Sequence, residues 1–233
     1  LFVFLEISSL SSYVMISLGR DRRALTAAYR YLIMGTIGAT FYIIGVGLMY
    51  MMTGTLNMAD LATLMPTIAN TRVIQAALAF LTVGICLKLA LFPLHLWLPN
   101  AYTYAPSVVT AFLAATATKV AVYILIRIIF TVFGAVNVFQ VLDLQNILMA
   151  LSIIAMFAAS GIAIYQDNIK RLFAYSSIAQ IGYIVLGLSF ASEIGMAAGI
   201  IHLFNHAIMK CAIFMGLGCI ALRVGGVSIR DMY

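Results

Sequence analysis

The sequence predicts an all-α fold, a polytopic transmembrane helical bundle with one discontinuous, proline-broken helix near residues 88–99. The chain is 64% hydrophobic and only 9% charged, whereas soluble domains are about 45–50% apolar and about 25% charged. Most of its apolar runs reach the roughly 20 residues that a helix needs to span a bilayer. Strands of a membrane β-barrel would be about half as long and would alternate in polarity. A soluble globular domain is therefore excluded.

Seven apolar segments follow one another along the chain, and short polar stretches separate them. The stretch 19–23 holds three arginines, and the stretch 166–171 holds a lysine and an arginine. The longer stretch 54–72 leaves room for a short interfacial helix around 57–64. The expected helices cover 1–18, 24–53, 71–102, 106–133, 145–165, 169–191 and 194–222.

The segment 71–102 differs from the others because it contains Pro93 and Pro99. Proline lacks a backbone donor and clashes with the carbonyl four residues before it. We expect a first half that ends near 88–91 and a second half that runs from Pro93 to Tyr102. Broken helices at membrane depth mark ion or substrate sites in transporters. The alternative is an ordinary proline kink followed by a re-entrant loop.

The net charge of +6 comes from bases in short loops, where membrane proteins use them to set orientation. This placement does not suggest nucleic-acid binding. We expect a multi-pass protein of the cell inner (plasma) membrane, with the basic loops 19–23 and 167–171 in the cytoplasm. The opposite side then receives only Arg72 and Arg127. The bases expected on the cytoplasmic side are Arg20, Arg22, Arg23, Arg30, Lys170, Arg171, Arg223 and Arg230.

The three cysteines, Cys86, Cys211 and Cys219, lie in apolar segments. They are interpreted as small buried hydrophobic residues, with no disulfide framework and no metal site. The chain opens on Leu1 within an apolar run and has no recognisable terminus at either end. We expect 1–233 to be a single transmembrane domain and a fragment of a longer subunit.

Six ionisable residues lie inside the apolar segments, where each costs several kcal/mol unless it is paired or shielded from lipid. Counted at 1.5 Å per residue from the nearest polar boundary, they lie well inside a hydrocarbon core about 30 Å thick. An intramembrane ionisable residue is a functional hypothesis by default. The six candidate site residues, assigned to proton translocation, are Glu6, Lys88, Lys119, His202, His206 and Lys210.

His202, His206 and Lys210 are spaced four residues apart, which places them on one face of one helix. Histidine exchanges protons near neutral pH, so this face suits a hydrated proton relay. A buried lysine can also lose and regain a proton near neutral pH. Glu6 could act as a switch on whichever lysine approaches it, or form a static ion pair that joins two helices. His95 belongs either to the pathway or to the packing.

Six motifs along almost the whole chain resemble the antiporter-like proton-translocating membrane subunit family. This family includes antiporter-like subunits of respiratory complex I (NADH:quinone oxidoreductase) and the A and D subunits of Mrp-type cation/proton antiporters. The motifs are Leu5-Glu6-Ile7, the run 88–101 (KLALFPLHLWLPNA), Ala105-Pro106-Ser107, Thr118-Lys119-Val120, the run 167–177 (DNIKRLFAYSS) and the run 202–210 (HLFNHAIMK).

The resemblance implies a protein of about fourteen helices with two inverted repeats, of which this chain runs from the fifth helix to just past the eleventh. It implies that Glu6 pairs with Lys88 and that Lys119 is the next lysine of the proton path. It places His202, His206 and Lys210 in the central relay, and it implies no cofactor.

The function that the resemblance implies is proton translocation within an Mrp-type Na⁺/H⁺ antiporter, because the run 54–61 (GTLNMADL) looks most like the Mrp D subunit. The alternative is a proton-pumping subunit of a complex I-type NADH:quinone oxidoreductase or a related membrane hydrogenase. In either setting the partners are other membrane subunits, the lipid bilayer and protons, with Na⁺ in the first. Direct quinone chemistry is disfavoured, since the chain lacks an iron–sulfur cysteine cluster and a dinucleotide motif.

Overall fold

The computed structural model describes residues 1–19, 21–135, 137–141 and 144–229. Its described residues form helices joined by turns, with one isolated antiparallel bridge between Asn168 and Ser228. The α-helices are α1 (Phe2–Ser17), α2 (Arg22–Thr53), α3 (Met58–Ile68), α4 (Arg72–Leu89), α5 (Leu98–Tyr104), α6 (Ser107–Ile126), α7 (Leu144–Ile164), α8 (Ile169–Ser189) and α9 (Glu193–Val224), and the π-helices are η1 (Arg127–Phe133) and η2 (Asn137–Val141).

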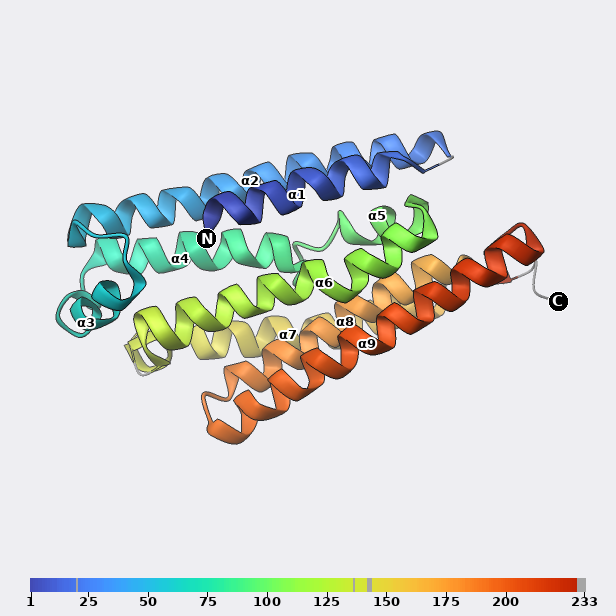
Figure 1. The fold of residues 1–233 in the computed structure, drawn as a ribbon. Coiled ribbons are helices and arrows are strands. Elements are labelled where there is room, and N and C mark those ends of the chain that lie inside the picture. Colours follow the sequence, from blue (N-terminus) through green and yellow to red (C-terminus); the bar gives the residue numbers. More distant parts are fainter. Residues whose placement is uncertain (20, 136, 142–143, 230–233) are drawn as a thin grey trace.

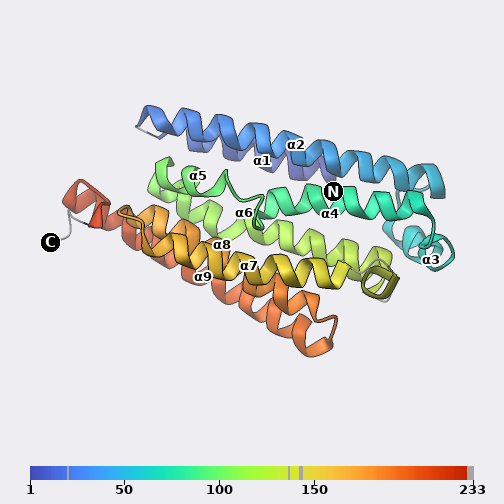
Figure 2. The same ribbon diagram turned by 180° about the vertical axis from the view of Figure 1, so that it is seen from behind.

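The helices lie side by side in an elongated bundle (Figure 1). Helices α1, α2 and α4 pack together on one side, and α7, α8 and α9 pack together on the other. Helix α6 lies between the two groups and contacts both α4 and α9, as the view from behind also shows (Figure 2). Side chains of α6 can therefore meet residues from both halves of the bundle.

Among the described residues, six helices are long and apolar enough to cross a membrane. They are α2, α4, α6 together with η1, α7, α8 and α9. Helix α1 is apolar but has only 16 residues, fewer than the roughly 20 of a full span. The chain is a multi-span membrane protein.

The polar stretches between the apolar segments supply the residues that start the helices. Asp21, Asn57, Asn168 and Ser192 precede α2, α3, α8 and α9, and each side chain accepts a hydrogen bond from a backbone N–H of the first turn. Such caps satisfy donors that have no partner within the helix. Gly54 ends α2 with φ +69°, a left-handed conformation that glycine adopts at little cost.

The helical conformation of the segment 71–102 stops at Leu89 and resumes at Leu98. Ala90 is left-handed (φ 60°), and the chain then passes through turns up to Trp97. The expected second half was wrong at its start, because the residues after Pro93 form turns and Pro99, in the first turn of α5, opens the new helix. The Trp97 indole donates to the Leu87 carbonyl at 2.9 Å, so side chains satisfy part of the freed backbone.

The structure places the connections of the bundle at two opposite ends (Figure 1). The α1–α2, α5–α6 and α7–α8 connections lie at the end where α9 finishes. The α6–α7 and α8–α9 connections lie at the other end of the bundle, which is also the end where α3 lies. Of the bases expected in the cytoplasm, Arg20 and Arg230 lie outside the described residues. The others belong to α2, α8 and α9. All but Arg30 lie within three residues of a helix terminus at the end of the bundle where α9 finishes.

Candidate functional site

Glu6 of α1 and Lys88 of α4 form an ion pair at the point where α4 breaks. Lys88 Nζ donates to Glu6 Oε1 at 2.5 Å and to Ser9 Oγ at 3.0 Å. The Lys88 side chain is 10% exposed and the Glu6 side chain 21%. Lys88 is the penultimate residue of α4, and the C-terminal end of a helix favours a cation. The structure therefore holds a charged pair half-way along the bundle, beside non-helical backbone.

Lys119 lies on the central helix α6 and has no carboxylate partner in the described part of the chain. Its side chain is 8% exposed. Its Nζ donates to the Ala114 carbonyl and lies 3.4 Å from Thr118 Oγ1. Neutral partners stabilise the charge of a buried ammonium less than a carboxylate in an ion pair does.

His202, His206 and Lys210 lie along one side of α9, as their spacing predicts. The two imidazole rings are stacked, with centroids 6.2 Å apart and planes inclined by 10°. His206 and Lys210 are buried and His202 is partly exposed. Neither ring nitrogen of His206 has a hydrogen-bond partner among the described residues. Buried polar atoms are normally satisfied by protein or ordered water, so we expect water beside this ring.

Helix α8 supplies partners to the α9 side chains that sequence reasoning missed. Gln180 Oε1 lies 2.7 Å from His202 Nε2. Lys210 Nζ donates to Ser176 Oγ and to the Phe173 carbonyl, both at 3.0 Å. Ser176 and Gln180 are four residues apart on α8, so they lie on the same side of the helix. This four-residue spacing of two polar residues is the signal from which the partners could have been predicted. The spacing alone does not show which neighbouring helix the two side chains face.

The structure packs the helix that carries Lys119 against the helix that carries the other candidate residues of the second half of the bundle. Helix α6, which carries Lys119, packs against α9, which carries His202, His206 and Lys210. No hydrogen bond within the described ranges joins the Glu6–Lys88 pair to Lys119. Helices α1 and α4 both contact α6, however, so the two sets belong to neighbouring helices.

Two further ionisable side chains lie near the broken helix. Lys170, from the basic stretch 167–171, lies in the first turn of α8 and is 6% exposed, and its Nζ donates to the Ala105 carbonyl at the end of α5 at 3.1 Å. The free carbonyls at a helix end attract a cation, which accounts for this contact. His95 is 5% exposed and packs against the rings of Phe92 and Tyr175.

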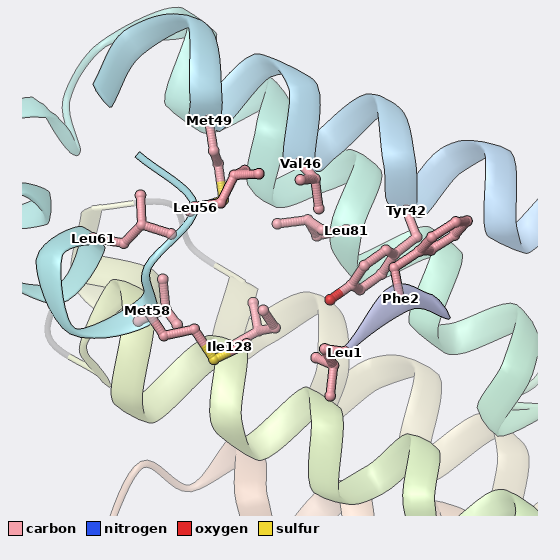
Figure 3. A pocket seen from close by; sticks show the side chains of 11 residues that line it. Leu1, Phe2, Tyr42, Val46, Met49, Leu56, Met58, Leu61, Leu81 and Ile128 are labelled. Atoms are coloured by element: carbon pink, nitrogen blue, oxygen red, sulfur yellow. The ribbon is translucent and has the colours of Figure 1, made fainter. Parts of the chain in front are cut away.

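An apolar cavity of about 220 Å³ lies away from all six predicted residues, near the first residues of the chain (Figure 3). Among the labelled side chains, Tyr42 alone carries an oxygen. The cavity lining therefore includes no charged side chain that could bind an ion. The lining residues are Leu1, Phe2, Tyr42, Val46, Met49, Leu56, Met58, Leu61, Leu81, Ile128 and Val132.

The chemistry available to these side chains is proton exchange. Carboxylate, ammonium and imidazole groups each accept or release a proton at accessible cost when their surroundings are tuned. Within the described ranges, no three His, Cys, Asp or Glu side chains gather as metal ligands would. The arrangement thus supports a path for protons between helices.

Comparison with known proteins gives one family. The model of the family described as NADH:quinone oxidoreductase/Mrp antiporter, TM, matches residues 1–233. NADH-quinone oxidoreductase subunit N of Desulforudis audaxviator is 44% identical, with 99% of this chain and 46% of that protein covered. The Na⁺/H⁺ antiporter D subunit of Alkalihalophilus pseudofirmus is 31% identical, with 100% of this chain and 46% of that protein covered.

A solved structure of an archaeal respiratory membrane complex, the membrane-bound sulfane sulfur reductase, contains a similar chain. The two superpose with a TM-score of 0.90 at 38% identity, over 99% of this chain and 46% of that one. This chain thus spans about half the length of the relatives it matches. The match over all residues and the shared fold show that the chain belongs to the NADH:quinone oxidoreductase/Mrp antiporter transmembrane family.

Proposed function

We propose that this chain is part of a longer antiporter-like subunit and that it moves protons along Glu6, Lys88, Lys119, His206 with His202, and Lys210. The observation that carries the proposal is the placement of these groups on helices that pack side by side, within an otherwise apolar bundle. Protons would pass through ordered water between the side chains, roughly in the plane of the membrane. The basic end of the bundle would face the cytoplasm, since short cytoplasmic loops are rich in arginine and lysine.

The Glu6–Lys88 pair would act as the gate of this path. Contact with Glu6 stabilises the Lys88 ammonium. If the two side chains separate, an unpaired ammonium remains in apolar surroundings, which is costly and favours release of its proton. The break directly after Lys88 gives the end of α4 freedom to move without bending a continuous helix. A change in the pair would in this way start a transfer toward Lys119.

Two settings fit a member of this family. In the first, electron transfer in partner subunits drives the proton movement, and the relatives from respiratory complexes, at 44% and 38% identity, favour it. In the second, the chain works in an Mrp-type assembly in which proton entry drives Na⁺ export, and the relative from a Na⁺/H⁺ antiporter supports it. The proteins that copurify with the full-length protein would separate the two settings.

The proposal is tested by neutralising the gate in the full-length protein. Glu6→Gln and Lys88→Ala should each lower proton translocation at least about tenfold, equivalent to about 1.4 kcal/mol in the barrier. Translocation is measured in inverted vesicles with a pH-sensitive dye. Glu193→Gln is the matched control, because Glu193 is an exposed acid and the first residue of α9. Normal rates in both gate variants would overturn the proposal, provided that immunoblots show wild-type amounts of protein.

A further inference from the structure

A second cavity, of about 190 Å³, lies between the N-terminal part of α2 and α5, and nothing in the proposed function uses it. We name it the arginine cavity. It lies at the basic end of the bundle, away from the six site residues. Its lining residues are Arg23, Thr26, Ala27, Arg30, Asn100 and Tyr104.

The chemistry of the arginine cavity suits an anion. Two guanidinium groups line it and no acidic residue does. Arg23 lies over the Tyr104 ring, 5.9 Å from the centroid, and neither arginine forms an ion pair within the described part of the chain. Arginine presents several fixed donors that match the oxygens of a phosphate group. The Asn100 amide and the Thr26 hydroxyl add neutral donors.

The face of α2 below the cavity is apolar and exposed. Arg23, Arg30, Ile37 and Ile44 recur every seven residues, about two helical turns, and so lie along one side of the helix. Ile37 is 43% exposed and Ile44 is 40% exposed. Cations thus lie at the end of the helix and apolar side chains follow toward its middle. An anionic phospholipid has the same order, with its phosphate at the interface and its acyl chains below.

We propose that the arginine cavity binds the phosphate of an anionic phospholipid, whose acyl chain lies along Ile37 and Ile44 of α2. Soluble anions also carry phosphate groups, but the exposed isoleucines favour a lipid. An acyl chain can pack against these side chains, whereas inorganic phosphate has no apolar part that could contact them. Basic pockets between transmembrane helices are known to hold anionic headgroups in this way. The site is separate from the proposed proton path. In the described part of the chain, no hydrogen bond, ion pair or ring contact joins a residue of the arginine cavity to one of the six candidate site residues.

Native mass spectrometry of the detergent-purified, full-length protein tests the site. The variant Arg23→Gln/Arg30→Gln should bind phosphatidylglycerol at least about tenfold more weakly than the wild type. The control Arg72→Gln/Arg127→Gln removes the same charge at the other end of the bundle and should bind like the wild type. Equal binding by both double variants would overturn the proposal.

Measurements on the wild type keep the test decisive if the cavity variant does not fold. Phosphatidylglycerol should bind more tightly than phosphatidylcholine, and inorganic phosphate at millimolar concentration should not displace it. Displacement by inorganic phosphate would show a soluble-anion site and refute the lipid assignment. Crosslinking of Arg30→Cys to a neighbouring protein in the intact membrane complex would show a protein partner there and refute it equally.

Discussion

At the scale of single residues, the three buried lysines have two kinds of partner. Lys88 faces a carboxylate, whereas Lys119 and Lys210 each face a hydroxyl and a carbonyl oxygen within the described residues. An ammonium in apolar surroundings is stabilised less as its partners lose charge. The ion pair therefore distinguishes Lys88 from Lys119 and Lys210, whose ammonium groups have only neutral oxygen partners among the described residues.

Replacement of Lys119 by arginine separates proton transfer from charge. Lys119→Arg keeps a cation at the site, but a guanidinium does not release its proton in proteins. We expect proton translocation in inverted vesicles to fall at least about tenfold. The matched control is Arg127→Lys, the reverse exchange at the start of η1 on the same long helix, which should leave the rate unchanged. Translocation at the wild-type rate in Lys119→Arg would exclude proton exchange at this position.

The six ionisable residues could be found from sequence because each interrupts an apolar run that must face lipid or protein. Their partners could not be found in the same way. The contact of Gln180 with His202 depends on how α8 is rotated against α9, and rotation is a property of the packed pair. The burial of Lys170 likewise depends on where α5 ends, which the sequence places only roughly.

At the scale of elements, the packing of α2 against α4 depends on close approach of their backbones. A Cβ atom added to Gly45 would lie 2.6 Å from Leu81 Cγ and 2.9 Å from the Ala77 carbonyl oxygen. In a bilayer, burial from water does not drive helices together, so small residues that allow tight contact supply the attraction. The same contact fixes α4, and with it the position of Lys88.

A pair of glycines two residues apart on α2 tests this contact. Gly45→Ala should destabilise the protein by about 1–3 kcal/mol, because the methyl group forces the helices apart. Gly47→Ala should be neutral or stabilising by up to about 1 kcal/mol, since nothing lies within 4 Å of its added Cβ and alanine favours helix. The measurement is the thermal unfolding midpoint of the purified protein in detergent. Equal midpoints for the two variants would show that α2 and α4 do not pack through Gly45.

The helices themselves are predictable because a bilayer imposes their length and apolar character. The conformation of the chain inside the broken segment cannot be predicted from the sequence in the same way. Pro93 and Pro99 indicate an interruption, but the turns between Ala90 and Trp97 are held by contacts such as the Trp97 indole on the Leu87 carbonyl. Those contacts form only when the two halves are already placed against α2 and α6. Local sequence therefore predicts the existence of the break and not the residue at which helix resumes.

At the scale of the whole molecule, the two ends of the bundle carry different charge. Among the described residues, the end with the α1–α2 and α7–α8 connections has Arg22, Arg23, Lys170, Arg171 and Arg223, whereas the other end has Arg72 and Arg127. An excess of bases in short loops marks the cytoplasmic side. Each helix that spans the membrane carries the chain to the opposite side. Once one end of the bundle is assigned to a side of the membrane, the other end is therefore assigned as well.

Single cysteines at the two ends of α8 test this orientation. The helix has 21 residues and is about 31 Å long, enough to cross the hydrocarbon core. Asp167→Cys, in the α7–α8 connection, should react with a membrane-impermeant maleimide in inverted vesicles and not in intact cells. Glu193→Cys, at the start of α9, should show the opposite pattern. Cys86, Cys211 and Cys219 lie within spanning helices, so the parent protein gives the background. The reverse pattern would place the basic end outside the cell, and labelling of both positions from one side would mean that α8 does not cross the membrane.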